Sequence, residues 1–297
     1  MAISYRCIGV HVSAAGGVEN APGRAKEAGA ECFQFFSRSP RGGAAPRINA
    51  GQASEFRAKC KQYGFESYIH TPYYINFASK KKQLRESAPR IVQEELARGS
   101  MLGVKYVVTH LGSARDWAGA SAGHTPREAL DATAAGLREI FAGRRPASTA
   151  GEQQFSAKLL LEISAGSGSV IGDKFEELVY LLDKLGRADV YVCLDTCHLF
   201  ASGYDVRTAE SWQETMRQFR SILGIAQLKL VHANDSKTGF KSHVDRHEHI
   251  DRGKIGAAGF RAMLAHPDLQ KVNFILETPS DKLITEDIKK LKKWRIK

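Results

Sequence analysis

The chain has 297 residues, of which 43% are hydrophobic and 25% are charged, and this balance is ordinary for a globular protein. No run approaches the ~18 apolar residues of a membrane span, and the N-terminal residues have no signal-peptide layout, so we expect a cytoplasmic protein without a membrane segment. The five cysteines are odd in number, which favours reduced thiols. The formal net charge of +11 favours a polyanionic partner such as nucleic acid.

Eight short hydrophobic runs predict buried β-strands. They are rich in β-branched or aromatic residues and bounded by Gly, Ser, Pro or Thr, and they cover residues 5–12, 31–37, 65–70, 104–110, 158–163, 190–195, 228–233 and 273–277. Helical patterns follow residues 52, 83, 126, 175 and 210, and loops are expected at 40–43, 143–157 and 236–256. Alternating strands and helices predict a parallel sheet. Eight such units predict an α/β protein with one (β/α)8 TIM-barrel domain over residues 1–297.

Histidine or carboxylate side chains lie at the ends of most of these predicted strands. Four runs end at or near a histidine and three at a carboxylate, in chain order His11, His70, His110, Glu162, Asp195, His232 and Glu277. Parallel strands of a barrel end on one rim, which is where barrel enzymes keep their active sites. Imidazoles and carboxylates that converge on one rim form a site for divalent metals.

Two local patterns extend this set. The motif DTCH places Asp195 and His198 three residues apart, and in isolation it also fits a helix-capping Asp followed by a surface His. The loop motif DRH places Asp245 and His247 two apart, which suits one ion but lacks a third ligand. We expect His198 to supply it. Cys193 and Cys197 lack a CxxC spacing, so no sulfur-bound zinc is expected.

The remaining candidates have supporting or surface roles. Glu162 and Glu277 must be paired, protonated or metal-bound, because a buried lone carboxylate is costly. His11 is expected outside the ligand shell, hydrogen-bonded to a ligand or to substrate. The other histidines are expected to be surface residues or flanking residues that bind no metal: His124, His243, His249 and His266.

Eight motifs, in order along the whole chain, resemble the endonuclease IV family of apurinic/apyrimidinic (AP) endonucleases. They are HVSAAGG at 11–17, IHTPYYINFAS at 69–79, THLGS at 109–113, LEISAGSG at 161–168, DTCHLFASGYD at 195–205, HANDSK at 232–237, DRHEHIDRGKIG at 245–256 and LETP at 276–279. The resemblance implies a TIM barrel with three Zn²⁺ on its rim. It assigns His70 and His110 to the first zinc, Glu162 as a bridge, Asp195, His232 and Glu277 to the second, and His198, Asp245 and His247 to the third. Manganese is an alternative at the carboxylate-rich positions.

The same resemblance implies hydrolysis of DNA 5′ to an abasic site, leaving a 3′-hydroxyl, and trimming of blocked 3′ ends in base-excision repair. Glu162 would also orient the attacking hydroxide. By the same resemblance, Arg41, Tyr73 and Tyr74 are expected to penetrate double-stranded DNA, although the two tyrosines also fit ordinary packing on the barrel rim. The enzyme is expected to be a monomer. This sequence has Leu111 and Ile163 where the family often has Pro and Asn. A sugar isomerase or epimerase of related fold, or a non-catalytic DNA-binding or metal-storage barrel, is the alternative.

Overall fold

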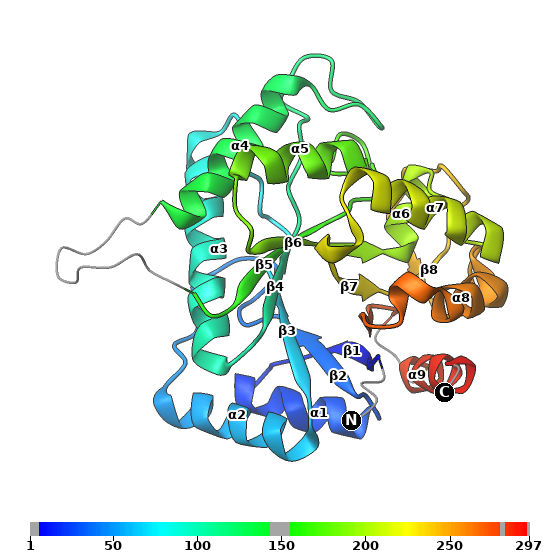
Figure 1. The fold of residues 1–297 in the computed structure, drawn as a ribbon. Coiled ribbons are helices and arrows are strands. Elements are labelled where there is room, and N and C mark those ends of the chain that lie inside the picture. The colour runs from blue at the N-terminus through cyan, green and yellow to red at the C-terminus, as the bar shows by residue number, and fades with distance from the viewer. Residues whose placement is uncertain (1–5, 143–154, 280–282, 296–297) are drawn as a thin grey trace.

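The computed structural model describes residues 6–142, 155–279 and 283–295, and its centre is a closed barrel of eight parallel strands (Figure 1). Each strand lies inside a run predicted from the sequence, so the predicted fold class is confirmed. The strands are β1 (Ile8–Val12), β2 (Cys32–Phe35), β3 (Glu66–His70), β4 (Tyr106–Thr109), β5 (Lys158–Glu162), β6 (Val190–Asp195), β7 (Leu228–His232) and β10 (Asn273–Leu276). Around the barrel they follow the order β1-β10-β7-β6-β5-β4-β3-β2.

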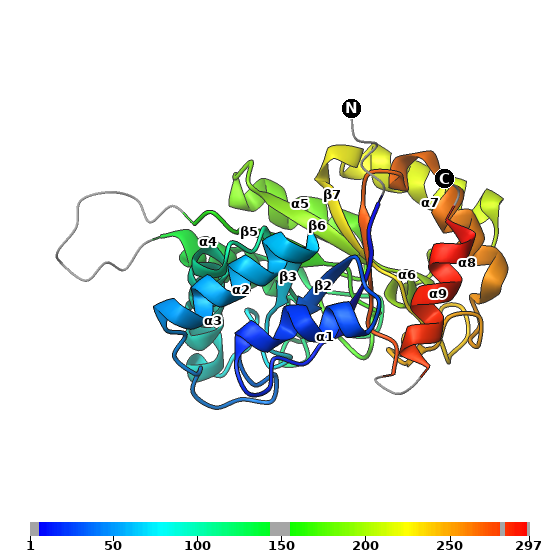
Figure 2. The same ribbon diagram turned by 90° about the horizontal axis from the view of Figure 1, so that it is seen from below.

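Helices lie on the outside of the barrel (Figures 1 and 2). The five expected helices are α2 (Ala50–Tyr63), α3 (Lys82–Leu102), α4 (Arg127–Phe141), α5 (Phe175–Leu185) and α7 (Ala209–Ile222). Residues Asn49 and Gln52 start α2 with a capping box, and left-handed glycines end α2, α3 and α5 at Gly64, Gly103 and Gly186. These local signals explain why the sequence placed α2, α3 and α5 correctly.

Further helices did not emerge from the pattern: α1 (Ala21–Glu27), α6 (Thr196–Ser202) and α8 (Gly256–Ala265). The first two have seven residues each and show too few turns for a 3.6-residue period. The Lys-rich C-terminal segment forms α9 (Ile284–Trp294). The loop expected at 236–256 was partly wrong, because β8 (Asp235–Ser236) and β9 (His247–Glu248) pair there as a small antiparallel sheet. Most of the loop expected at 143–157 lies outside the described residues.

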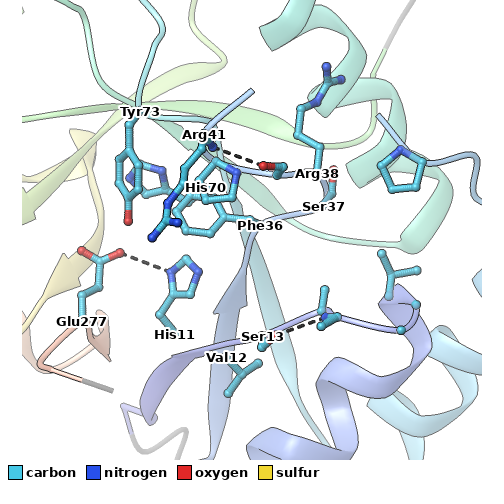
Figure 3. Close-up of a pocket in the computed structure, with 18 of the residues that line it drawn as sticks. His11, Val12, Ser13, Phe36, Ser37, Arg38, Arg41, His70, Tyr73 and Glu277 are labelled. Atoms are coloured by element: carbon cyan, nitrogen blue, oxygen red, sulfur yellow. Dashed lines mark hydrogen bonds and ion pairs between the residues drawn. The ribbon is translucent and has the colours of Figure 1, made fainter. Parts of the chain in front are cut away.

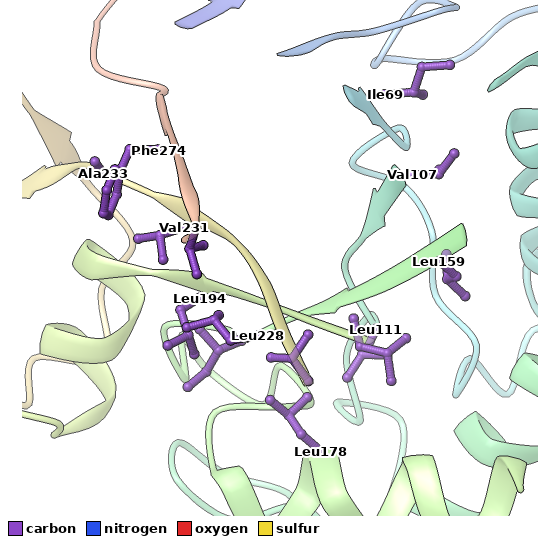
Figure 4. Packing of buried hydrophobic residues seen from close by; sticks show 14 of the residues in the cluster. Ile69, Val107, Leu111, Leu159, Leu178, Leu194, Leu228, Val231, Ala233 and Phe274 are labelled. Carbon is purple, nitrogen blue, oxygen red and sulfur yellow. The ribbon is translucent and has the colours of Figure 1, made fainter. Parts of the chain in front are cut away.

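Two hydrophobic layers hold the barrel. The larger layer fills the space between strands and helices (Figure 4). The smaller layer fills the barrel interior and consists of Cys32, Tyr68, Tyr106, Val108, Leu160, Cys193, Leu230 and Ile275. Side chains alternate along a strand, so the next inward-facing residue lies two positions further toward the carboxyl end. The last inward-facing positions of the strands hold the residues of the candidate site.

All five cysteines are free, in agreement with the expectation of reduced thiols. Among the described residues, no helix combines the length and the apolar character needed to cross a membrane.

Candidate metal centre and adjoining pocket

The structure brings the predicted strand-end residues together on one rim. Five occupy the last two positions of their strands and two directly follow a strand: His11, His70, Glu162, Asp195 and His232, then His110 and Glu277. The other three predicted ligands come from loops and a helix beside this rim. His198 lies in α6, directly after β6, while Asp245 and His247 belong to the segment that ends in β9.

Glu162 lies at the centre of the cluster and is almost completely buried. Its Oε2 atom is 3.0 Å from His70 Nε2 and 3.6 Å from His110 Nδ1. Its Oε1 atom is 3.0 Å from His232 Nδ1 and 3.5 Å from His198 Nδ1. One carboxylate therefore faces four imidazoles, with its two oxygens divided between two sides of the cluster.

Potential ligand atoms fall into three main groups, each spanning at most 4.8 Å: His70, His110 and Glu162; Glu162, Asp195, His232 and Glu277; and His198, Asp245 and His247. In the third group, Asp245 Oδ2 is 3.3 Å from His198 Nε2, and Asp245 Oδ1 is 3.2 Å from His247 Nε2. His198 is the partner that the loop pair lacked in the sequence. These groups coincide with the three ligand sets that the resemblance implied.

Asp195 has two functions, one for each oxygen. Its Oδ1 accepts a hydrogen bond from the backbone N–H of His198 at 2.9 Å and so caps α6. Its Oδ2 accepts from Asn234 Nδ2 at 2.6 Å and lies 3.7 Å from His247 Nε2. The capping interpretation of DTCH is thus correct for Asp195, but His198 is buried rather than on the surface.

The backbone fixes which nitrogen of three histidines faces the carboxylates. In each, Nδ1 donates to a carbonyl oxygen: His70 to Thr71 at 2.7 Å, His198 to Ile163 at 2.8 Å and His247 to Glu277 at 3.1 Å. The Nε2 atoms of His198 and His247 are buried without a hydrogen-bond partner in the described part of the chain. Buried nitrogens held this way, opposite carboxylates, are typical of metal ligands, so the residues fit a metal.

The electrostatics of the cluster favour a cation. Burial opposes charge on Glu162, but imidazoles led by that of His110 hold the pKa of its carboxyl well below its usual value. Burial also opposes charge on His198 and His247, yet carboxylates led by that of Asp195 raise the pKa of His198 well above its usual value and that of His247 to about 9. The cluster therefore attracts positive charge, which protons or a divalent metal can supply.

Cys197 also lies close to this group, within 4.8 Å of ligand atoms of Asp195 and His247. Its Sγ contacts the carbonyl oxygen of Arg246 at 3.7 Å, and burial raises the pKa of the thiol to about 12. A thiol that keeps its proton is a poor metal ligand. The expectation of no sulfur-bound zinc therefore stays a prediction at this position.

A cavity of about 1280 Å³ opens above the cluster. Its walls include the 13–17 loop, residues 36–41, Tyr73 and several candidate ligands (Figure 3). Tyr73 is 63% exposed, and its ring centroid is 5.2 Å from that of Phe36. Arg41 also lines the cavity, while Tyr74 is not among its lining residues. The structure therefore brings two of the three predicted DNA-contact residues to the pocket.

A buried ionic network anchors the loop that carries Arg41. Glu95, on α3, is completely buried and accepts hydrogen bonds from Arg38 Nε at 2.6 Å and from Ser37 Oγ. Arg98, one turn further along α3, donates to the carbonyl oxygens of Ser37 and, at 2.8 Å, Pro46. Both ends of the loop are thus fastened to one helix.

His11 lies beside the ligand cluster as expected, with Nδ1 3.4 Å from Glu277 Oε1 (Figure 3). Among the other histidines, His124 is exposed as predicted. The surface assignment of His266 was wrong: it is buried, and its Nδ1 accepts from the backbone N–H of Asp268 at 3.3 Å at the start of a short helix. His243 and His249 belong to none of the ligand groups found among the described residues.

Sequence reasoning missed four residues of the site: Gln34, Phe36, Glu95 and Asn234. Gln34 and Glu95 are polar residues inside otherwise apolar strand or helix patterns, and that interruption was the available signal. Asn234 follows the strand end at His232, and its side chain contacts two ligand residues. Nothing in the local pattern distinguishes Phe36 from its neighbours.

Comparisons with known proteins agree with this geometry. A family model described as a xylose isomerase-like TIM barrel matches residues 22–294. The probable endonuclease 4 of Methanoculleus marisnigri is 39% identical over 276 residues, which are 92% of this chain and 93% of that protein. The crystal structure of endonuclease IV from Thermus thermophilus is 32% identical with a TM-score of 0.79, covering 97% of this chain and 98% of that one. Within the xylose isomerase-like TIM barrels, the chain therefore belongs to the endonuclease IV family, and the predicted resemblance is confirmed.

A more distant solved structure shares the fold alone. A D-tagatose 3-epimerase-like protein superposes with a TM-score of 0.69 over 96% of both chains, at 18% sequence identity.

Proposed function

We propose that the protein is a metal-dependent AP endonuclease of base-excision repair. It hydrolyses the DNA phosphodiester 5′ to an abasic site, leaves a 3′-hydroxyl and trims blocked 3′ ends. The observation that carries this proposal is the third ligand group, His198, Asp245 and His247, which adjoins the other two and opens into the cavity. A sugar isomerase or epimerase needs one or two metals and has no use for this extra group.

Three zinc ions per chain are the proposed cofactors. His70 and His110 would hold the first, Asp195, His232 and Glu277 the second, and His198, Asp245 and His247 the third, with Glu162 between the first two. Zinc is favoured because five of the nine ligands are imidazoles, while manganese is the alternative where carboxylates dominate. In such sites zinc supplies Lewis acidity toward a phosphoryl oxygen and activates water near neutral pH.

The protein's own residues hold the reacting groups in place. Glu162 stays ionised, because the surrounding imidazoles lower its pKa, so it orients a water or hydroxide by accepting hydrogen bonds and does not act as an acid. Arg41 and Arg47, both exposed on the cavity wall, would meet phosphates on either side of the lesion.

Hydrolysis fits the cavity better than elimination does. Among the described residues that line the cavity there is no lysine, so no amine is placed to form a Schiff base with an opened sugar. Tyr73 offers an exposed aromatic face near the ligands, suited to fill the gap left by a missing base. Recognition would therefore depend on the shape of the damaged duplex, since an abasic site has no base to read.

The test is nicking of a labelled duplex that contains a reduced abasic analogue, which cannot undergo β-elimination. We expect cleavage without added magnesium, loss of activity after prolonged chelation, and a product that a DNA polymerase extends from its 3′ end. Glu162→Gln should be nearly inactive while keeping the fold. Failure to cleave, together with interconversion of a ketohexose at C3, would overturn the proposal in favour of an epimerase.

We also propose that the enzyme acts as a monomer on cytoplasmic DNA. Every group of the proposed centre comes from one chain, so catalysis needs no second copy. Sedimentation of the zinc-loaded protein, alone and with an abasic duplex, tests this: activity confined to a dimer would contradict it.

A further inference from the structure

Gln34 is the one polar residue of β2, and it is completely buried on the inner face of the barrel. In the strand register it pairs with His11 of β1 and with Tyr68 of β3. Its side chain lies directly beside the second ligand group. An amide there must find partners for two N–H groups and one oxygen, because an unpaired buried polar group is costly.

The amide of Gln34 finds all of these partners within the site. Its Nε2 donates to Glu277 Oε1 at 2.6 Å and to His11 Nδ1 at 3.0 Å. Its Oε1 accepts from His232 Nε2 at 3.0 Å. The orientation of the amide is forced, because an ionised carboxylate only accepts hydrogen bonds and Glu277 must therefore face the NH₂ group.

This orientation of the amide sets the tautomer of His232. Since Gln34 Oε1 only accepts, the proton of His232 stands on Nε2 and the Nδ1 atom faces the carboxylates. That Nδ1 is 3.0 Å from Glu162 Oε1 and 3.3 Å from Glu277 Oε2. The three histidines held by backbone carbonyls present Nε2 instead, so His232 is turned the opposite way, and a side chain rather than the backbone turns it.

The same amide acts on Glu277 and His11. Its N–H group occupies Glu277 Oε1, which leaves Oε2 to face His232. Its second N–H group occupies His11 Nδ1, so His11 carries its proton on Nε2. The Nε2 atom of His11 is buried without a partner in the described part of the chain, and His11 lines the cavity. Its N–H is therefore free to donate to a ligand.

We propose that Gln34 is a positioning residue that sets three groups at once: Nδ1 of His232 and Oε2 of Glu277 as the ligand atoms of the second metal, and Nε2–H of His11 as a donor to substrate phosphate. The inference deepens the proposed function and rests on its metal assignment. Gln34 contacts His11, His232 and Glu277 and is not itself one of the proposed ligands.

The test compares Gln34→Met, Gln34→Glu and Gln93→Met. Methionine has nearly the same volume but makes none of the three hydrogen bonds. Glutamate keeps the oxygen that accepts from His232 but loses both donors. Gln93 is the matched control, because its Nε2 donates to the carbonyl oxygen of Ile140 between α3 and α4. Thermal unfolding of all three variants establishes that they fold.

Two readouts apply to the full-length protein without DNA. The first is zinc affinity, measured by competition with a chromophoric chelator: we expect one of three zinc ions to bind about 10–100-fold more weakly in Gln34→Met, and no change in Gln93→Met. The second is the tautomer of each ring, from proton–nitrogen correlation spectra of histidine-labelled protein. His232 should keep Nε2–H in Gln34→Glu and lose that preference in Gln34→Met, while His11 loses it in both.

Wild-type zinc affinity together with an unchanged His232 tautomer in a folded Gln34→Met would overturn the inference. Because neither readout involves DNA, this failure is separate from failure of the proposed function. A protein that does not cleave abasic DNA would still show whether Gln34 orders the metal ligands.

Discussion

The network around Glu95 predicts that one buried charge holds the loop with Arg41 in place. Glu95 lies between Arg38, whose Nε is 2.6 Å away, and Arg98, whose Nε is 3.8 Å away, and its carboxylate is completely buried. Glu95→Gln keeps the shape and removes the charge. The adjacent Glu94 pairs with the same Arg38 at 2.6 Å but is 58% exposed, so Glu94→Gln is the matched control.

The expected magnitudes differ because the two carboxylates differ in burial. Removing one partner of a buried pair costs about 3–5 kcal/mol, and we expect about 3 kcal/mol for Glu95→Gln because Arg38 keeps Glu94. For a chain of this size that lowers Tm by about 6 °C, at roughly 2 °C per kcal/mol. An exposed pair contributes about 0–1 kcal/mol, so Glu94→Gln should change Tm by about 2 °C at most.

The assay has two parts. Thermal unfolding of the zinc-loaded proteins measures stability, and binding to abasic and intact duplexes measures discrimination. Glu95→Gln should lose discrimination as well as stability, because Arg41 stands in the loop that Ser37 and Arg38 fasten to α3. Equal effects of the two substitutions on Tm, or full discrimination in a destabilised Glu95→Gln, would refute the reasoning.

Three further predictions concern other parts of the molecule. His198→Ala should reduce bound zinc from three ions to two per chain by elemental analysis without unfolding the barrel; retention of three ions would contradict the ligand assignment. Tyr73→Ala should weaken the preference for abasic over intact duplex by about 1–3 kcal/mol and leave its salt dependence unchanged, whereas Tyr74→Ala should change neither; equal losses would assign both tyrosines the same role. Burial raises the pKa of Glu31, but the bidentate pair with Arg295 leads the interactions that together outweigh burial and lower the pKa of this carboxyl. The pair therefore contributes its full stability above the ordinary glutamate pKa of about 4.3. That stability is lost as the pH falls through the lower pKa of the folded state. The difference in Tm between wild type and Glu31→Gln should therefore shrink between about pH 6 and about pH 3, and a constant difference would show that the charge does not matter.

The sequence predicted the barrel and the clustering of histidines and carboxylates on one rim because both follow from short-range rules. In a parallel barrel, polar residues at the carboxyl ends of the buried strands all lie on the same rim, so His70, Glu162 and His232 could be placed together without coordinates. The third group was harder, since Asp245 and His247 lie off the strands, and only their need for a partner pointed to His198.

What the sequence did not predict depends on distant pairs. Ser37 and Arg38 meet Glu95 across 57 or 58 residues, and Gln34 meets His232 across 198. No spacing rule links residues so far apart; only the fold does. The sequence also could not distinguish two adjacent tyrosines. Both follow the same strand end, yet Tyr73 lines the cavity and Tyr74 does not.

The balance of charge explains how an acidic-looking cluster can attract a polyanion. The proposed centre contains four carboxylates, Glu162, Asp195, Asp245 and Glu277, whose combined charge does not neutralise three divalent ions. The loaded centre therefore keeps positive charge at the floor of the cavity, where a phosphodiester can meet it. Without metal, positive charge at the centre comes only from protons on the imidazoles, which leaves a smaller excess to attract the DNA backbone. Metal loading should thus control DNA affinity as well as catalysis, and the steep fall of that affinity with salt should flatten when the ions are removed.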